Sequence, residues 1–74
     1  MKIISRETLA TLRAQYPKGT RVELVHMDDP YTKLTAGDIG TVNHVDDMGT
    51  IHINWDCGSS LGAVYGVDIV KKEK

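Results

Sequence analysis

The chain has 74 residues, of which 41% are hydrophobic and 26% charged, a composition typical of one small globular domain. Its net charge of −1 and pI of about 6.2 lack the basic excess that is usual in proteins that bind phosphate backbones. The single cysteine, Cys57, excludes an internal disulfide, and no run of ~18 apolar residues could span a membrane. The first residues lack the long apolar stretch of a signal peptide, so we expect a cytoplasmic protein.

The first expected element is a short helix from Ser5 to Gln15. Ser5 can act as its N-cap, because the hydroxyl can accept a hydrogen bond from an unpaired backbone N–H group of the first turn. Leu9, Leu12 and Tyr16 form a narrow apolar stripe at helical spacing. A helix of about ten residues is not stable alone in water, so this stripe must pack on the rest of the protein.

After a turn at Tyr16–Gly19, apolar residues recur with a period of two, which is typical of strands. A long loop is expected at Asp28–Asp38, and Tyr65–Val67 is expected to form one tight helical turn. The pattern predicts five short strands, at residues 21–27, 39–45, 50–55, 59–64 and 68–72.

Two Asp-x-Gly triplets, Asp47–Gly49 and Asp56–Gly58, flank the third expected strand. Each fits a three-residue hairpin loop whose glycine adopts the left-handed conformation. The first loop places Val45 opposite Ile51, and the second places Ala63 opposite the same isoleucine. Both registers turn Ile51 inward, so the two hairpin predictions are consistent with each other.

The expected strands combine into one architecture. Val42 and Val45 can both point inward only if a β-bulge separates them, so we expect a bulge near Asn43. Five strands, a long first loop, two tight hairpins and a helical turn match a small SH3-like barrel. The expected fold class is therefore mainly β, with one N-terminal helix and a five-stranded SH3-like barrel. The expected division is a helix packed on the barrel, the barrel domain and a frayed tail, at residues 1–16, 17–72 and 73–74.

Several motifs follow one another between residues 17 and 68, in the segment PKGTRVELVHMDDPYTKLTAGDIGTVNHVDDMGTIHINWDCGSSLGAVYGVD. They are a G-T-R-V-E-L strand, an M-D-D-P-Y loop, a G-T-V segment followed by a D-D turn, and an I-H-x-x-W-D-x-G-S-S-L hairpin. This combination resembles a small bacterial and phage family catalogued as domain of unknown function 4314. The resemblance implies an SH3-like fold and a bacterial or mobile-element setting, and it implies no activity. Cys57 departs from the Asn that is frequent there, and the expected helix lies outside the resemblance.

A partner-binding surface is predicted where the first long loop meets the helical turn. Asp28 and Asp29 can recognise a basic partner or, alternatively, accept backbone N–H bonds that hold the shape of the loop. Tyr31 and Tyr65 can form an aromatic ledge for a peptide, because the loop and the turn lie near each other in an SH3-like topology. Lys33 completes the loop segment that we expect the partner to contact.

Neither a metal, a cofactor nor a catalytic group is expected. His44 and His52 are predicted cross-strand neighbours on the outer face, with Asp46 nearby. Two imidazoles and a carboxylate could hold zinc, but structural zinc usually takes four protein ligands, so two solvated histidines are expected instead. Cys57 lies in an exposed turn without a base or a pocket, and we therefore expect no enzyme.

The sequence thus predicts a non-catalytic binding module for a protein or peptide partner, present as a monomer or a weak homodimer. The resemblance suggests an accessory or inhibitory factor. The alternative is a nucleic-acid-associated small barrel, argued from fold analogy, although the lysines and arginines are scattered along the chain. A third hypothesis is a self-assembling structural protein.

Overall fold

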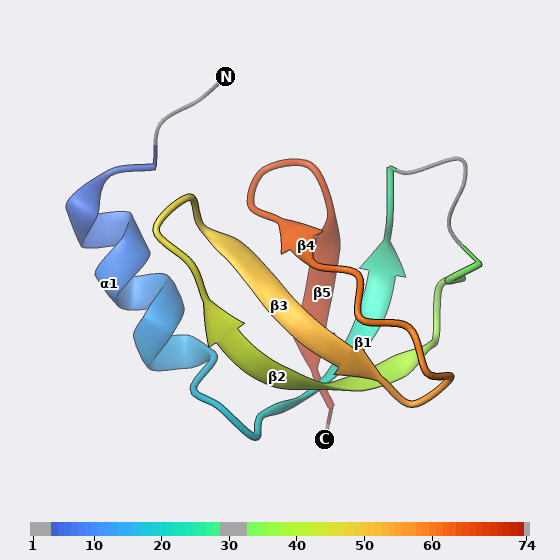
Figure 1. The fold of residues 1–74 in the computed structure, drawn as a ribbon. Helices are drawn as coiled ribbons and strands as arrows, with labels where there is room; N and C mark the ends of the chain where they lie inside the picture. The colour runs from blue at the N-terminus through green and yellow to red at the C-terminus, as the bar shows by residue number, and fades with distance from the viewer. Residues whose placement is uncertain (1–3, 29–32, 74) are drawn as a thin grey trace.

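The computed structural model describes residues 4–28 and 33–73. Within these residues, one helix lies beside a five-stranded antiparallel sheet (Figure 1), which confirms a mainly β fold with a single helix. The elements in chain order are α1 (Arg6–Gln15), β1 (Arg21–His26), β2 (Ile39–Val45), β3 (Thr50–Trp55), β4 (Ala63–Val64) and β5 (Ile69–Lys72).

Helix α1 begins as predicted, at the N-cap Ser5, whose hydroxyl oxygen accepts a hydrogen bond from the N–H of Thr8 at 3.1 Å. Leu12 is buried, and Leu9 and Tyr16 are partly buried against the core. The apolar stripe is therefore the packing face of the helix, and it holds α1 alongside β2 (Figure 1).

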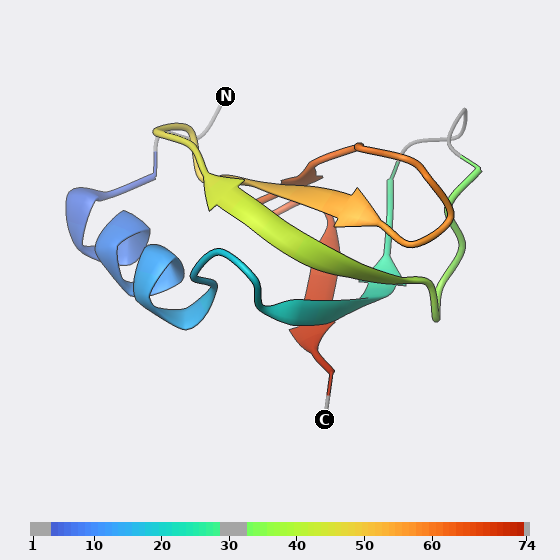
Figure 2. The same ribbon diagram turned by 60° about the horizontal axis from the view of Figure 1, so that its bottom comes forward.

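The sheet has the strand order β4-β3-β2-β1-β5. Figure 2 shows that it is strongly bent, so that the β2–β3 hairpin arches over β1 and β5. Among the described residues, β4 pairs with β3 and β5 pairs with β1, but no pairing joins β4 to β5. The sheet is therefore open along one side.

The hairpin between β2 and β3 has the predicted three-residue loop. Asp46 and Thr50 flank this loop, and the N–H of Asp46 donates to the carbonyl of Thr50 at 3.0 Å. Gly49 has a φ of +84°, in the left-handed region that residues with a side chain rarely adopt. Val45 pairs with Ile51, which confirms the predicted register.

The second hairpin loop is also confirmed. The N–H of Trp55 donates to the carbonyl of Ser59 at 2.8 Å, and Gly58 has a φ of +98°. Ala63 pairs with Ile51 in the predicted register.

The strand after this hairpin is shorter than predicted. The alternating pattern of residues 59–64 predicted six strand residues, but β4 contains two. In the middle of the expected strand, the carbonyl of Leu61 accepts a hydrogen bond from the indole N–H of Trp55 at 2.8 Å. This contact draws the chain toward the indole ring and away from a ladder with β3.

The predicted β-bulge lies at Asn43, where the β2–β3 register shifts between Val42 and His44. Because of the bulge, Val42 and Val45 both point inward although three positions separate them. The buried core joins the helix, the long loop and β1 to β4. It consists of Leu12, Val22, Leu24, Leu34, Val42, Val45, Ile51, Ile53, Trp55 and Ala63.

Candidate binding surface

Asp68, between the β4–β5 turn and β5, links two segments that lie far apart in the sequence. Its Oδ1 accepts a hydrogen bond from the N–H of Asp28 at 2.8 Å, and its Oδ2 accepts one from the N–H of Val64 at 2.9 Å. The chain enters the long loop at Asp28, so this carboxylate fixes the beginning of the loop to the turn. The expected proximity of the loop and the turn is therefore found at Asp28.

The turn between β4 and β5 carries Tyr65. The N–H groups of Val67 and Asp68 both donate to the carbonyl of Val64, at 3.1 and 2.9 Å. Gly66 has a φ of +83°, which interrupts the right-handed backbone. The prediction of a regular helical turn is therefore wrong, and the segment is a hydrogen-bonded turn with one left-handed residue.

Apolar side chains are exposed in a row along this turn and the strands beside it. Their exposed fractions lie between 42% and 54%, although each belongs to a residue type that is more often buried or half-buried. We call these residues, together with Asp28, the turn surface: Asp28, Val64, Tyr65, Val67 and Ile69. Because contiguous apolar patches mark sites of interaction with other molecules, we treat the turn surface as a candidate binding surface.

A groove of about 270 Å³ lies between α1 and the β4–β5 segment. Its floor is formed by side chains of the sheet interior, and its two walls come from the helix and from the turn with β5. We call it the α1–β5 groove, and it is lined by Leu12, Gln15, Tyr16, Ile51, Ala63, Tyr65, Gly66, Asp68, Ile69 and Val70.

The predicted partner-binding residues are only partly covered by the described residues. Asp28 and Lys33 are exposed, and Tyr65 has an exposed fraction of 52%. Asp29 and Tyr31 lie outside the described residues. The carboxylate of Asp68 links Asp28 to Val64, the residue before Tyr65. The roles of all five residues in binding stay predictions.

Sequence reasoning missed Asp68 and the helical wall of the groove. Asp68 follows a Gly-Val step, where aspartate is an ordinary turn residue, and nothing in the local pattern signals a bond to Asp28. Tyr16 was assigned to the apolar stripe and Gln15 only to the end of the helix, because helical periodicity separates core from solvent but does not reveal a groove.

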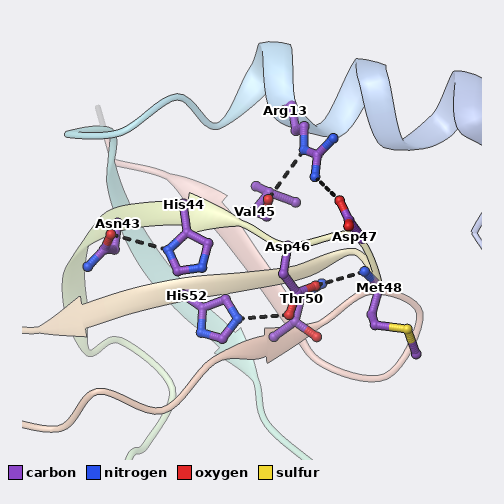
Figure 3. Close-up of polar contacts among 9 residues, drawn as sticks. All are labelled: Arg13, Asn43, His44, Val45, Asp46, Asp47, Met48, Thr50 and His52. Carbon is purple, nitrogen blue, oxygen red and sulfur yellow. Dashed lines mark hydrogen bonds and ion pairs between the residues drawn. The ribbon is translucent and has the colours of Figure 1, made fainter.

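The outer face of the β2–β3 hairpin carries the predicted pair of histidines (Figure 3). His44 and His52 are opposite each other in the ladder, and their rings stack with centroids 4.3 Å apart and an angle of 10° between planes. The Nε2 atom of His52 lies 2.8 Å from Oδ2 of Asp46, and Nδ1 of His44 lies 3.2 Å from Oδ1 of Asn43. Within the described part of the chain, no group of three or more His, Cys, Asp or Glu side chains is arranged to hold a metal ion.

Asp46 organises the loop of this hairpin. Its Oδ1 accepts hydrogen bonds from the N–H groups of Met48 and Thr50, both at 2.9 Å. The hydrogen bond with His52, and then these two backbone bonds, stabilise the charged form and hold the pKa of Asp46 below its ordinary value, although partial desolvation opposes them.

The lowered pKa of Asp46 predicts how stability depends on pH. A carboxylate whose pKa is lower in the folded state stabilises the fold above its unfolded pKa, and this contribution is lost as the pH falls through the folded pKa. Asp46→Asn should therefore be less stable than the wild type at neutral pH, and the difference should shrink as the pH falls below about 4. Urea unfolding at a series of pH values measures it.

The matched control is Asp47→Asn, which removes the neighbouring carboxylate, itself paired with Arg13 at 2.7 Å on the protein surface. This variant keeps the bonds to Met48 and Thr50. An equal pH response of Asp46→Asn and Asp47→Asn would contradict the assigned role of Asp46.

Arg21 on β1 connects two other parts of the sheet. Its guanidinium donates two hydrogen bonds to the carboxylate of Asp56, at 2.8 and 2.6 Å, and lies 3.4 Å from Glu73. The hydrogen bonds to Asp56 and its negative charge raise the pKa of Arg21, and the hydrogen bonds from Arg21 and its positive charge lower the pKa of Asp56. Glu73, assigned to the expected tail, also donates its backbone N–H to the carbonyl of Arg21 at 2.9 Å. The cationic group of Arg21 is therefore already paired within the chain.

Among the described residues, no helix has the length and the apolar character needed to cross a membrane. Comparison with curated proteins and comparison with solved structures each give no match. A family model described as Domain of unknown function (DUF4314) matches residues 5–73. This match includes α1, which the resemblance in the sequence had left outside. The chain therefore belongs to the DUF4314 family.

Proposed function

We propose that the protein is a non-catalytic module that binds a protein or peptide partner at the turn surface. The observation that supports this most is the double hydrogen bond of Asp68, which fixes the exposed apolar turn against the entrance of the long loop. The turn surface therefore combines an exposed aromatic side chain, three exposed aliphatic side chains and an exposed carboxylate.

The energetics of burial support a macromolecular partner. Covering apolar surface stabilises a complex by about 25 cal/mol per Å² before the costs of association are subtracted. Tyr65 offers a large apolar ring with a polar end, the kind of side chain that is enriched at interfaces. Because Asp68 and the left-handed Gly66 already fix the turn, little conformational entropy is lost when a partner covers it.

For the fold, we propose that the bent sheet is a partly open SH3-like barrel. The strand order with β5 next to β1, the long loop between β1 and β2, and the turn before β5 support this proposal. We further propose a cytoplasmic role in a bacterium or a mobile genetic element, which rests on the family resemblance. Nuclear Overhauser effects between backbone protons of β4 and β5 would support a partly closed barrel, and their absence would argue for an open sheet.

The ion pairs argue against a phosphate-backbone ligand. Arg13 pairs with Asp47, Arg21 with Asp56, and Lys71 with Glu23. These cations are thus partly neutralised inside the molecule, whereas binding to nucleic acid depends on free cations that replace counterions.

The test is a selection of displayed random peptides on the immobilised protein, followed by affinity measurements for wild type and Tyr65→Ala. We expect the truncation to weaken binding roughly tenfold or more, as for an aromatic anchor at the centre of an interface. The control is Thr11→Ala, at an exposed position of α1 outside the turn surface and the groove, which should bind like the wild type.

Circular dichroism and urea unfolding establish that both variants fold. If no peptide is selected, or if Tyr65→Ala retains full affinity, the proposal is wrong. Labelled DNA and RNA are titrated in parallel at low and high salt. Binding that weakens steeply with salt would favour the nucleic-acid alternative.

A further inference from the structure

We infer that the partner occupies the α1–β5 groove as a single extended segment, with a basic side chain at the Asp28 end and an acidic side chain at the Lys72 end. This inference rests on the proposed function, because it specifies the chemistry of the partner that reaches the turn surface. Three observations support it: the size of the groove, the free edge of β5 and the charges at the two ends.

The size of the groove favours peptide side chains over a small-molecule ligand. At about 270 Å³, it lies below the range of about 300–1,000 Å³ that is typical of pockets for drug-sized ligands. Most of the residues that line it are apolar, with Ile51 and Ala63 on the floor and Leu12 and Ile69 on the walls. The groove therefore suits one or two apolar side chains of a longer chain that continues over the turn surface.

The edge of β5 favours an extended backbone. β5 pairs with β1 along one side and stands at the end of the sheet order. Figure 1 shows β5 beside β1. The β5 residues Ile69 and Val70 line the groove. The backbone groups at the edge of a sheet can pair with an added strand, whose alternate side chains then enter neighbouring pockets.

The helix on the far side of the groove favours a single chain over a second copy of this protein. Leu12, Gln15 and Tyr16 of α1 face β5 across the groove. If the edge strand of a second copy paired with β5, the next strand of that copy would lie about 4.8 Å beyond it. Because side chains of α1 line the other side of the groove, we expect a lone extended segment to fit between α1 and β5, whereas the edge of another sheet would need the helix to move.

The charges give this segment a polarity. Asp68 lines the groove at the turn, with Asp28 beside it, and no ion pair reaches either carboxylate within the described residues. Toward the other end of β5, the Nζ atom of Lys72 lies 5.8 Å from the ring centroid of Tyr16. The partner is therefore favoured to carry a basic side chain at the end with Asp28 and Asp68 and an acidic side chain at the end with Lys72. An apolar side chain lies between them.

The first test fills the groove from the helix. Gln15→Trp places a large ring in the groove from an exposed position, and Ala14→Trp makes the same substitution one residue away, outside the lining. Random peptides are displayed and selected on the wild-type full chain. We expect the selected peptides to bind Gln15→Trp roughly tenfold or more weakly than Ala14→Trp.

The second test reverses one charge. Selected sequences should carry Lys or Arg on one side of an apolar residue and Asp or Glu on the other. Asp28→Lys should weaken binding of such a peptide by up to roughly fivefold. A peptide in which Glu replaces the basic residue should bind Asp28→Lys with the affinity restored. Glu7→Lys, at an exposed position of α1 outside the groove, is the control and should leave both affinities unchanged.

The outcomes separate the inference from the proposed function. If selected peptides lose affinity for Tyr65→Ala but bind Gln15→Trp and Ala14→Trp equally, the turn surface binds partners and the groove inference is overturned. If the peptides show no paired charges, or if Asp28→Lys changes no affinity, the inferred polarity is wrong. If no peptide is selected, both the function and the inference fail.

Discussion

Trp55→Ala is expected to lower the free energy of unfolding by about 3–5 kcal/mol, the usual cost of truncating a buried aromatic side chain. The indole is 3% exposed, and its N–H holds the carbonyl of Leu61 at 2.8 Å. A domain of 74 residues has a total stability of roughly 4–11 kcal/mol. The variant should therefore lose a large share of its stability and unfold at a much lower urea concentration than the wild type, as measured by far-ultraviolet circular dichroism.

Trp55→Phe separates the packing of the ring from its hydrogen bond. Phenylalanine retains most of the apolar volume but cannot donate to Leu61, so we expect a smaller loss of about 1–3 kcal/mol. Because the short β4 strand follows this contact, protection of the Ala63 amide against hydrogen exchange should fall with it. Equal unfolding free energies for Trp55→Ala and the wild type would show that the ring is not part of the core.

Gly40→Ala is expected to destabilise the protein by about 1–3 kcal/mol, because it overpacks the core. A Cβ atom at this position would lie 2.5 Å from Cγ2 of Ile53, 2.9 Å from Cε3 of Trp55 and 3.1 Å from the backbone oxygen of Asn54. The side chains can move only by disturbing the core, and the oxygen belongs to the strand that pairs with Gly40. Chemical unfolding followed by Trp55 fluorescence measures the loss.

Gly58 provides the matched control, because its substitution tests backbone strain without a clash. It has a φ of +98°, and a Cβ atom there would meet nothing within 4 Å. Gly58→Ala should cost about 1–2 kcal/mol, and Gly58→Asn less, since asparagine tolerates the left-handed region. Gly40→Asn should be at least as damaging as Gly40→Ala. If asparagine were the milder substitution at Gly40 too, backbone conformation rather than crowding would explain the effect.

Local rules predicted much of this fold before any tertiary contact was known. Ser5 starts the helix because a hydroxyl can satisfy a free N–H of the first turn. Gly49 and Gly58 form the hairpin loops because only glycine readily takes left-handed angles. The bulge at Asn43 follows from two inward valines whose spacing breaks a period of two.

One feature of the candidate surface, the proximity of the loop and the turn, was predicted from the expected strand topology. The loop entrance at Asp28 and the turn at Tyr65 were expected to be neighbours, and the structure joins them through Asp68. The bonding carboxylate itself was not predicted, since an aspartate in a turn looks the same whether it binds its own loop or a distant N–H. Asp29 and Tyr31, in the same predicted surface, lie outside the described residues.

By itself the sequence determined the helix, the first three strands, the two hairpin registers and the inward faces, because each depends on residues close together in the chain. Only the tertiary structure decided that β4 is short, that Arg21 pairs with Asp56 and that α1 forms a wall of a groove beside β5. Those features arise when the bend of the sheet brings together residues that are distant in sequence. Single polar contacts of this kind leave no periodic pattern, so the order of the residues alone does not reveal them.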